Sequence, residues 1–296
     1  MPSKQNVMPV AGLLSGALVW GVIWYPFRVL ENAGVGGALS TLLIYLLATV
    51  CGVFLWSRVR QDLPKVGWWG LVLVLTAGWS NFGYVLAILE GEVMRVLLLF
   101  YLAPVWTILF SFWLLGEHLN RYGYAIIFLS FAGAVVMLWE PHLGMPLPNN
   151  AAEWIGLSAG MGFALSNVVA RRCDHLSVET KSFGVWIGTA LLSLLYLAFQ
   201  GGLADRVAAV GGDSWLLLIL LGVVLCAVSF AVQYGISRVP ANRAIVLFLS
   251  ELVVAAIASY FLAGELMELR DWIGATLIVS ASLMSGRLYA AEKSDA

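Results

Sequence analysis

The sequence has little charge. Asp, Glu, Lys and Arg make up only 11% of its 296 residues, whereas soluble domains carry about 25%. A surface with so few charged side chains cannot face water everywhere, which excludes an ordinary soluble globular protein. The net charge of −1 also argues against a nucleic-acid partner, because such proteins present a basic face to phosphate.

Catalytic and metal-binding patterns are missing as well. The three cysteines, Cys51, Cys173 and Cys226, form no Cys-x-x-Cys pair, so we expect free thiols and no disulfide framework. The three histidines lie far apart in predicted loops, without metal-ligand spacing. The sequence contains no phosphate-binding Gly-x-x-x-x-Gly-Lys motif, no nucleophile elbow and no zinc-protease helix. We therefore expect no cofactor, no metal site and no enzyme activity.

Apolar runs dominate what is present, with 61% hydrophobic residues and a mean hydropathy of +0.91. A hydrocarbon core about 30 Å thick needs about 20 helical residues. Ten runs reach roughly this length: 9–30, 36–57, 66–89, 92–115, 121–139, 151–171, 180–200, 213–237, 241–263 and 269–288. The first run is long enough to span and its pattern recurs, so we do not interpret it as a cleaved signal peptide. The sequence predicts an all-α integral membrane protein with ten transmembrane helices.

The two halves of the chain resemble each other. An offset of 148 residues places Gly116-Glu117 on Gly264-Glu265. Between the halves lies a stretch rich in Pro, Gly and Asn, which is typical of a linker. We predict a first five-helix repeat over residues 1–141, a linker over 142–150 and a second five-helix repeat over 151–296.

Small residues recur near the start of each half. An offset of 144 residues places Gly12 and Gly16 on Gly156 and Gly160. Small residues four positions apart let two helix backbones approach closely. We interpret these glycines as packing positions and not as ligand sites.

Basic residues predict the orientation. If the amino terminus is cytoplasmic, twelve of the 16 Lys and Arg residues fall on the cytoplasmic side, as the positive-inside rule requires. Both termini are then cytoplasmic, and the chain is a multi-pass protein of the inner (plasma) membrane. Because five spans is an odd number, the second half is inserted upside down relative to the first. Inverted repeats of this kind build many secondary transporters.

Glu251 is an ionisable residue in the middle of the ninth run, between Leu249 and Leu252. A charge at this depth costs about 2.5–3.5 kcal/mol, so its side chain must face the bundle interior or carry a proton. One interpretation is a site for a substrate ammonium group or a proton. The other is a protonated carboxyl that joins two helices by a hydrogen bond.

Other polar and aromatic side chains fall at similar depth. The candidates for substrate binding are Trp20, Trp24, Asn81, Tyr84, Tyr101, Phe163, Asn167, Trp186, Gln233, Tyr234, Ser250 and Glu251. Each could instead make an ordinary interhelical hydrogen bond or packing contact. Together they predict an aromatic, mostly neutral cavity, which suits an amphipathic solute better than a bare ion. Pro104 lies inside the fourth run, where it forms either a hinge or a static kink.

The sequence resembles the EamA branch of the drug/metabolite transporter superfamily. The resemblance rests on the ten runs and on Gly116-Glu117 and Gly264-Glu265 at matched places in the two halves. The segments Trp20–Trp24 and Phe100–Trp106 look most similar to those of YddG-type aromatic amino acid exporters. The resemblance implies a central cavity between the halves that holds an aromatic or neutral amino acid, lined by the first, third, fourth, sixth, eighth and ninth helices.

These observations predict a secondary transporter that exports amino acids from the cytoplasm by alternating access. Its partners would be a small-molecule substrate and the lipid bilayer. Export of another drug-like or metabolite solute is the main alternative. Strongly anionic solutes are disfavoured because no Arg or Lys lies at mid-depth in the predicted spans. A membrane-embedded enzyme and a non-transporting scaffold are weaker alternatives, because no clustered catalytic set is present.

Overall fold

A computed structural model describes residues 7–91, 93–139, 147–263 and 268–284, and in these segments the chain forms helices joined by turns. The first half contains α1 (Val7–Asn32), α2 (Gly37–Cys51), η2 (Gly52–Leu55), α3 (Trp56–Asp62), η3 (Leu63–Lys65), α4 (Trp68–Glu90), α5 (Val93–Phe100), α6 (Ala103–Leu115) and α7 (Arg121–Leu138). The second half contains α8 (Ala151–Arg172), α9 (Val178–Gln200), α10 (Leu203–Ala208), α11 (Gly212–Ile236), α12 (Ala241–Phe248), α13 (Ser250–Ala263) and α14 (Leu269–Met284).

Eight helical segments in the described part of the chain are long and apolar enough to cross a membrane. They correspond to eight of the ten predicted runs. The other two runs, 151–171 and 269–288, are also helical and correspond to α8 and α14. α8 carries Glu153, Arg171 and Arg172 near its ends, and α14 is described over only 16 residues.

Side-chain caps explain where several helices begin. The Asn120 side chain accepts a hydrogen bond from the backbone of Gly123 at the start of α7, and Ser177 does the same for Thr180 at α9. At α8, Asn150 caps the backbone of Glu153 and donates its amide to the Glu153 carboxylate in return. Such reciprocal caps satisfy backbone donors that have no partner within the helix.

The fourth predicted run of each half is interrupted, whereas the sequence predicts a hinge or kink only in the first, at Pro104. The first interruption lies at Tyr101 and Leu102 between α5 and α6, and the second at Leu249 between α12 and α13. Tyr101 and Leu249 are 148 residues apart, which is the repeat offset. Pro104 lacks the N–H that would continue the first helix. The second helix is interrupted at the matching place without a proline.

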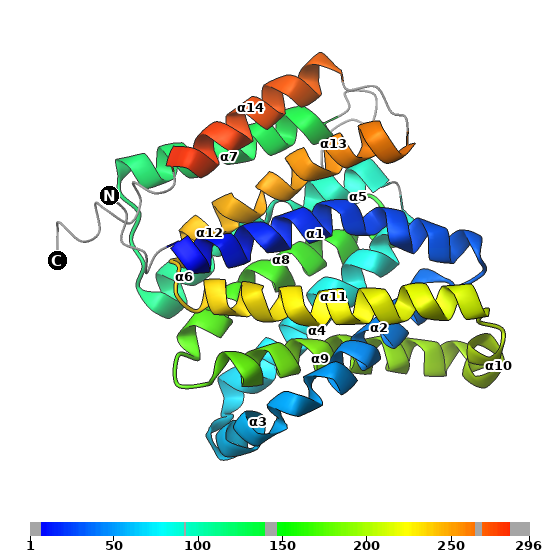
Figure 1. Cartoon of the computed structure of the whole chain (residues 1–296). Helices are drawn as coiled ribbons and strands as arrows, with labels where there is room; N and C mark the ends of the chain where they lie inside the picture. Colours follow the sequence, from blue (N-terminus) through cyan, green and yellow to red (C-terminus); the bar gives the residue numbers. More distant parts are fainter. Residues whose placement is uncertain (1–6, 92, 140–146, 264–267, 285–296) are drawn as a thin grey trace.

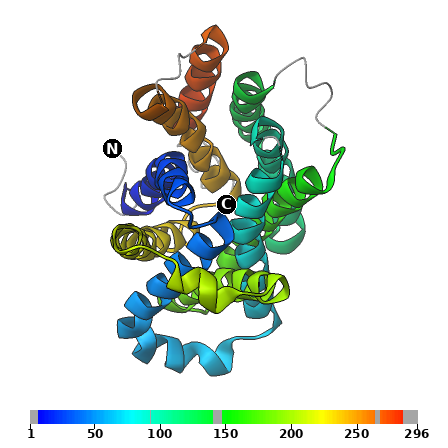
Figure 2. The same ribbon diagram turned by 90° about the vertical axis from the view of Figure 1, so that its right-hand side faces the viewer.

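Several helix pairs recur in the packing of the two halves. α4 packs on α8 and α9, and α11 packs on α1 and α2. Likewise α5 and α6 contact α8, whereas α12 and α13 contact α1. Exchanging each of these helices for its counterpart in the other half therefore reproduces these pairs. Figure 2 shows the helices nearly end-on, with α7 and α14 paired at one side of the bundle.

Glycine allows the closest of these contacts, as predicted for the small-residue pairs. A Cβ added at Gly12 would lie 2.3 Å from the Ala231 carbonyl oxygen, and one at Gly160 would lie 2.3 Å from the Phe100 carbonyl oxygen. Gly16 and Gly156 also abut neighbouring helices. The interpretation of these glycines as packing positions is confirmed.

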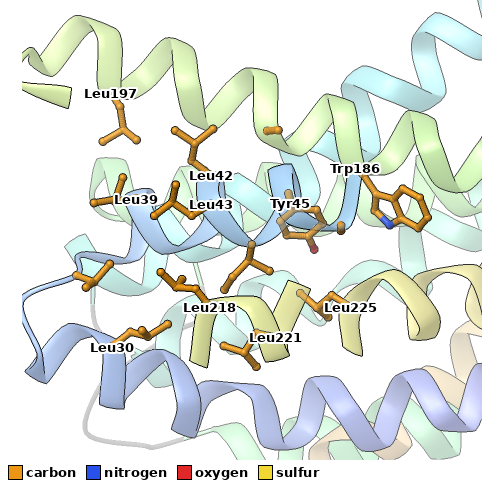
Figure 3. Packing of buried hydrophobic residues seen from close by; sticks show 14 of the residues in the cluster. Leu30, Leu39, Leu42, Leu43, Tyr45, Trp186, Leu197, Leu218, Leu221 and Leu225 are labelled. Atoms are coloured by element: carbon orange, nitrogen blue, oxygen red, sulfur yellow. The ribbon is translucent and has the colours of Figure 1, made fainter. Parts of the chain in front are cut away.

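The largest buried apolar cluster lies where α2 packs between α9 and α11. Figure 3 shows Tyr45 and leucines of α2 facing Trp186 and Leu197 of α9 on one side and Leu221 and Leu225 of α11 on the other. Large apolar side chains also cover the outside, for example Phe54 and Phe199, which are each 92% exposed. An apolar exterior around a packed interior is the pattern that a lipid environment requires.

The helices run broadly along one direction (Figure 1). We call the end of the bundle at which α1 begins the N-end. α14 finishes at the N-end, and Gly235 near the end of α11 packs on the Pro9 carbonyl there. α6 and α8 also end, and α9 and α12 begin, at the N-end.

Candidate functional site

The interruption of the ninth predicted run positions Glu251. α12 ends at Phe248 and α13 begins at Ser250, so Glu251 becomes the second residue of α13. A carboxylate in the first turn of a helix is stabilised by the unpaired backbone N–H groups there. The side chain is half-buried. Its neighbour Ser250, also a sequence candidate, donates its hydroxyl to the Leu247 carbonyl.

Two tyrosines of the first half face Glu251. Tyr101 lies in the matching interruption between α5 and α6, is 5% exposed, and lies close enough to interact with the Glu251 carboxylate. Tyr84 of α4 lies close enough to interact electrostatically with the same carboxylate. The structure therefore brings three sequence candidates together, and the contact between Tyr101 and Glu251 joins the two interruptions across the halves.

A chain of aromatic rings continues from these residues. We call Tyr84, Phe100, Tyr101, Phe163 and Phe248 the aromatic cluster. The ring centroids lie 5.0 Å apart for Tyr84 and Phe100, 5.7 Å for Phe100 and Phe163, and 5.3 Å for Phe163 and Phe248. Tyr84 and Phe163 are half-buried, so part of each ring is accessible. The cluster joins α4 and α5 of the first half to α8 and α12 of the second.

Phe100 and Phe248 were not among the sequence candidates. Phenylalanine in an apolar run resembles any lipid-facing residue, so composition and depth do not single it out. The signal that could have found them is the repeat itself, because Phe100 and Phe248 occupy equivalent positions 148 residues apart. Each lies at the last residue of a helix that precedes an interruption.

Pro104 lies in the first turn of α6 and not in the middle of a long helix. At that position the missing N–H of proline costs little. Proline also cannot donate to the Phe100 carbonyl four residues earlier, and it is this carbonyl that Gly160 of α8 approaches. Pro104 and Gly160 thus shape the backbone beneath the aromatic cluster.

Asn81 is held by neighbours in its own half. Its side-chain oxygen accepts a hydrogen bond of 2.7 Å from the Tyr45 hydroxyl, and its amide donates to the Ala77 carbonyl at 2.8 Å. This geometry matches the interhelical alternative, since the bond from Tyr45 ties α2 to α4. Both ends of the Asn81 amide are thus occupied.

Asn167 of α8 and Gln233 of α11 have unpaired polar atoms. They are 6% and 7% exposed. Within the described residues, the Asn167 amide nitrogen and the Gln233 amide oxygen have no hydrogen-bond partner. Native proteins rarely leave such groups unpaired unless water or a ligand meets them.

Asn167 and Gln233 lie at a similar level of the bundle. The Lys181 ammonium donates to the Ala170 carbonyl of α8 at 3.0 Å and to the Ser237 hydroxyl after α11 at 2.6 Å. Ala170 and Ser237 are therefore at one level, and α8 and α11 both run toward the N-end. Asn167 lies about one helical turn before Ala170 and Gln233 about one turn before Ser237, so these two residues are also level with each other. One offers a donor and the other an acceptor.

Four aromatic candidates lie elsewhere. Trp186 of α9 is fully buried against α2, where a Cβ at Gly52 would meet its ring at 2.3 Å (Figure 3). Tyr234 is covered near the N-end by the Arg238 guanidinium, 3.7 Å from its ring centroid. Trp20 packs against two apolar clusters, and Trp24 has a buried ring nitrogen without a partner in the described residues. The candidate site centres on Glu251, Tyr101 and the aromatic cluster.

Comparisons of the sequence with known proteins show which family the chain belongs to. The sequence matches the profile of the EamA-like transporter family over residues 8–139 and 150–287. An uncharacterized transporter of Archaeoglobus fulgidus is 32% identical over 207 residues, covering 69% of this chain and 71% of that protein. The uncharacterized transporter YojE of Bacillus subtilis is 23% identical over 237 residues, covering 75% and 74%.

A solved crystal structure has the same fold. It superposes with a TM-score of 0.73 at 20% sequence identity, covering 96% of this chain and 98% of the other. The family profile covers most of the chain in two segments, and the Archaeoglobus fulgidus relative spans more than two thirds of it. The chain belongs to the EamA-like transporter family and is a multi-pass membrane transporter.

Proposed function

We propose that this transporter exports amino acids with aromatic or large neutral side chains by alternating access between its two halves. The observation that carries the proposal is the contact between Tyr101 and Glu251, which joins the two helix interruptions beside the aromatic cluster. A carboxylate next to accessible rings offers complementary groups for the ammonium and the side chain of such a substrate.

Each part of the substrate would meet a different group. The ammonium would pair with Glu251 in place of the Tyr101 hydroxyl. The substrate side chain would stack against Tyr84 and Phe163, whose rings are half-buried. The unpaired Asn167 amide would donate to the substrate carboxylate. These contacts come from both halves, so substrate binding would depend on how the halves meet.

Alternating access is supported by the equivalence of the halves. Several pairs of helices recur in the packing of both halves, and both interruptions lie at positions 148 residues apart. Two similar bundles of opposite orientation can exchange roles, so that the two access states have comparable free energy. We further propose ten spans, an inverted second half, cytoplasmic termini and residence in the inner membrane, as the basic residues predict.

The test is counterflow of radiolabelled Trp, Phe, Thr and Met into proteoliposomes that contain only this protein. We expect Trp and Phe to accumulate faster than in empty vesicles. Equal rates for all four amino acids in protein-containing and empty vesicles would end the amino-acid assignment.

A thermal-stability screen of purified protein then tests whether the protein binds a different solute or no solute at all. A ligand that binds only the folded state raises Tm, and the rise grows with the logarithm of one plus the ratio of free ligand concentration to Kd. Stabilisation by a drug-like or metabolite solute, and not by amino acids, would support export of that solute instead.

A further inference from the structure

Glu117 joins the two halves at the N-end. Gly116 ends α6 in the left-handed region, with φ of +68°, and this turns Glu117 toward the second half. Its carboxylate lies 2.7 Å from the Arg171 Nε of α8, and it accepts hydrogen bonds from the Ala241 backbone at 3.5 Å and the Asn242 side chain at 3.4 Å. Glu117 therefore binds the end of α8 and the beginning of α12 at once.

Asp62 makes a second contact between the halves at the same end. Its carboxylate, at the end of α3, accepts hydrogen bonds from the Ser177 backbone at 2.8 Å and the Thr180 hydroxyl at 3.0 Å. Ser177 is the capping residue of α9 in the second half. Asp62 is 6% exposed, so the contact is shielded from solvent.

Arg172 adds a third contact. Its guanidinium donates to the Leu114 carbonyl of α6 and lies 4.9 Å from the centre of the Trp69 ring of α4. At the opposite end, the Tyr196 hydroxyl of the second half donates to the Glu90 carboxylate of the first half at 3.3 Å. This hydrogen bond is longer and exposed to solvent. Ionised hydrogen bonds that are partly buried hold more strongly than exposed ones.

We infer that Glu117 and Asp62 form a latch that holds the N-end closed and must release before the site can open toward that end. The inference rests on the alternating access proposed above. Polar contacts suit this role because, once parted, both sides can bond to water, whereas an apolar seam would expose surface at high cost. Through Ala241, Glu117 also holds the first residue of α12, the helix that leads to Glu251.

Cys173 provides a reporter within the native chain. It follows Arg171 and Arg172 at the end of α8, precedes Ser177, and is 1% exposed. It therefore lies between the Glu117 contact and the Asp62 contact. When the latch is closed, a polar thiol reagent cannot reach it, and release at the N-end would admit the reagent.

The experiment measures the modification rate of Cys173 by a polar maleimide in the full-length protein carrying Cys51→Ala and Cys226→Ala. We expect Glu117→Gln and Asp62→Asn each to raise this rate about tenfold, which corresponds to ~1.4 kcal/mol in the opening equilibrium. Glu90→Gln, at the opposite end, is the matched control and should leave the rate unchanged. Unchanged rates in both latch variants would overturn the inference.

Two further measurements separate release from loss of folding. A second protein keeps Cys226, in the middle of α11, as its only cysteine. Release should accelerate Cys173 alone, and equal acceleration of Cys226 would show general unfolding and refute the latch. Arg171→Gln should match Glu117→Gln, and the double variant should be no faster than either, because both remove the same pair.

These readouts do not depend on the substrate. A Cys173 that becomes reactive in a protein that moves no amino acid would leave the latch standing and remove the substrate assignment. Amino-acid counterflow together with an unchanged Cys173 modification rate would support the substrate assignment and refute the latch.

Discussion

Gly160→Ala is the substitution with the most direct structural consequence for the site. A Cβ at Gly160 would lie 2.3 Å from the Phe100 carbonyl oxygen and 2.8 Å from its Cα, whereas ordinary contact begins at 3.4 Å. The obstructing atoms are backbone, so no side-chain rotation relieves them. α8 and α5 must separate by about 1.1 Å at this point, the difference between 3.4 and 2.3 Å.

The cost is that of forcing extra volume into a packed interface, about 1–3 kcal/mol. For a chain of this size we expect Tm to fall by about 2–6 °C. Because Phe100 and Phe163 lie in the two helices that separate, substrate affinity should fall as well. Thermal unfolding in detergent gives the first quantity, and the substrate-induced rise in Tm gives the second.

Two companion substitutions calibrate the result. A Cβ at Gly156, one turn earlier, would meet the Val96 side chain at 3.0 Å, which can move, so Gly156→Ala should cost less. A Cβ at Gly212, in the first turn of α11, meets nothing within 4 Å, so Gly212→Ala should be neutral. If Gly160→Ala melted at the same temperature as Gly212→Ala, the close packing of α5 on α8 would be refuted.

Three further predictions concern polar groups. Glu251→Gln removes the proposed partner of the substrate ammonium, so the rate of counterflow should change several-fold. The control Thr276→Val, on the exposed face of α14, should leave the rate unchanged. If Glu251→Gln and the unmodified protein had identical kinetics between about pH 5 and pH 8, Glu251 would have a structural role only. Asn81→Ala and Tyr45→Phe should each lower stability by about 1–2 kcal/mol and the pair by no more than the larger single effect, as measured by thermal unfolding; full additivity would contradict a shared bond. Lys181→Met leaves acceptors at the ends of α8 and α11 without a donor, so Tm should fall by several degrees, and an unchanged Tm would show that the buried ammonium is dispensable.

The sequence identified the part of the site that carries an unusual cost. Glu251 stands out because a carboxylate at bilayer depth is expensive, and such a residue persists only where it is used or paired. Tyr84 and Tyr101 were found by the same argument from depth and polarity. The structure places all three together, which no periodicity within one helix could show.

Aromatic depth was a weaker guide. Trp186 lies deep in its span, yet the structure packs it against α2, away from the aromatic cluster. Phe100 and Phe248, which the sequence did not single out, belong to the cluster. An aromatic side chain in an apolar run is equally compatible with a lipid-facing surface, a packed core and a binding site. Which of these it meets depends on the neighbouring helix, and that information is not local in the chain.

The Gly-Glu junctions show the same limit. The sequence marked Gly116-Glu117 as a boundary between helices, and Gly264-Glu265, its counterpart, lies outside the described residues. Only the fold showed that Glu117 meets Arg171 and the beginning of α12 across the halves. The sequence predicted a hinge or kink at Pro104 in the first interrupted helix, but it predicted no break in the second, because apolar composition is the same on both sides of Leu249.

By itself the sequence determined that the chain lies in a membrane and is helical, and it predicted a repeat. Twenty-residue apolar runs must become helices in lipid, since every backbone polar group has to be paired internally, and duplicated patterns survive as matching residues. The tertiary structure alone decided which faces of those helices meet, where they are interrupted and which charges pair. Apolar side chains tolerate many neighbours at similar free energy, so partner choice is fixed by close backbone contacts and by a few polar groups distant in sequence.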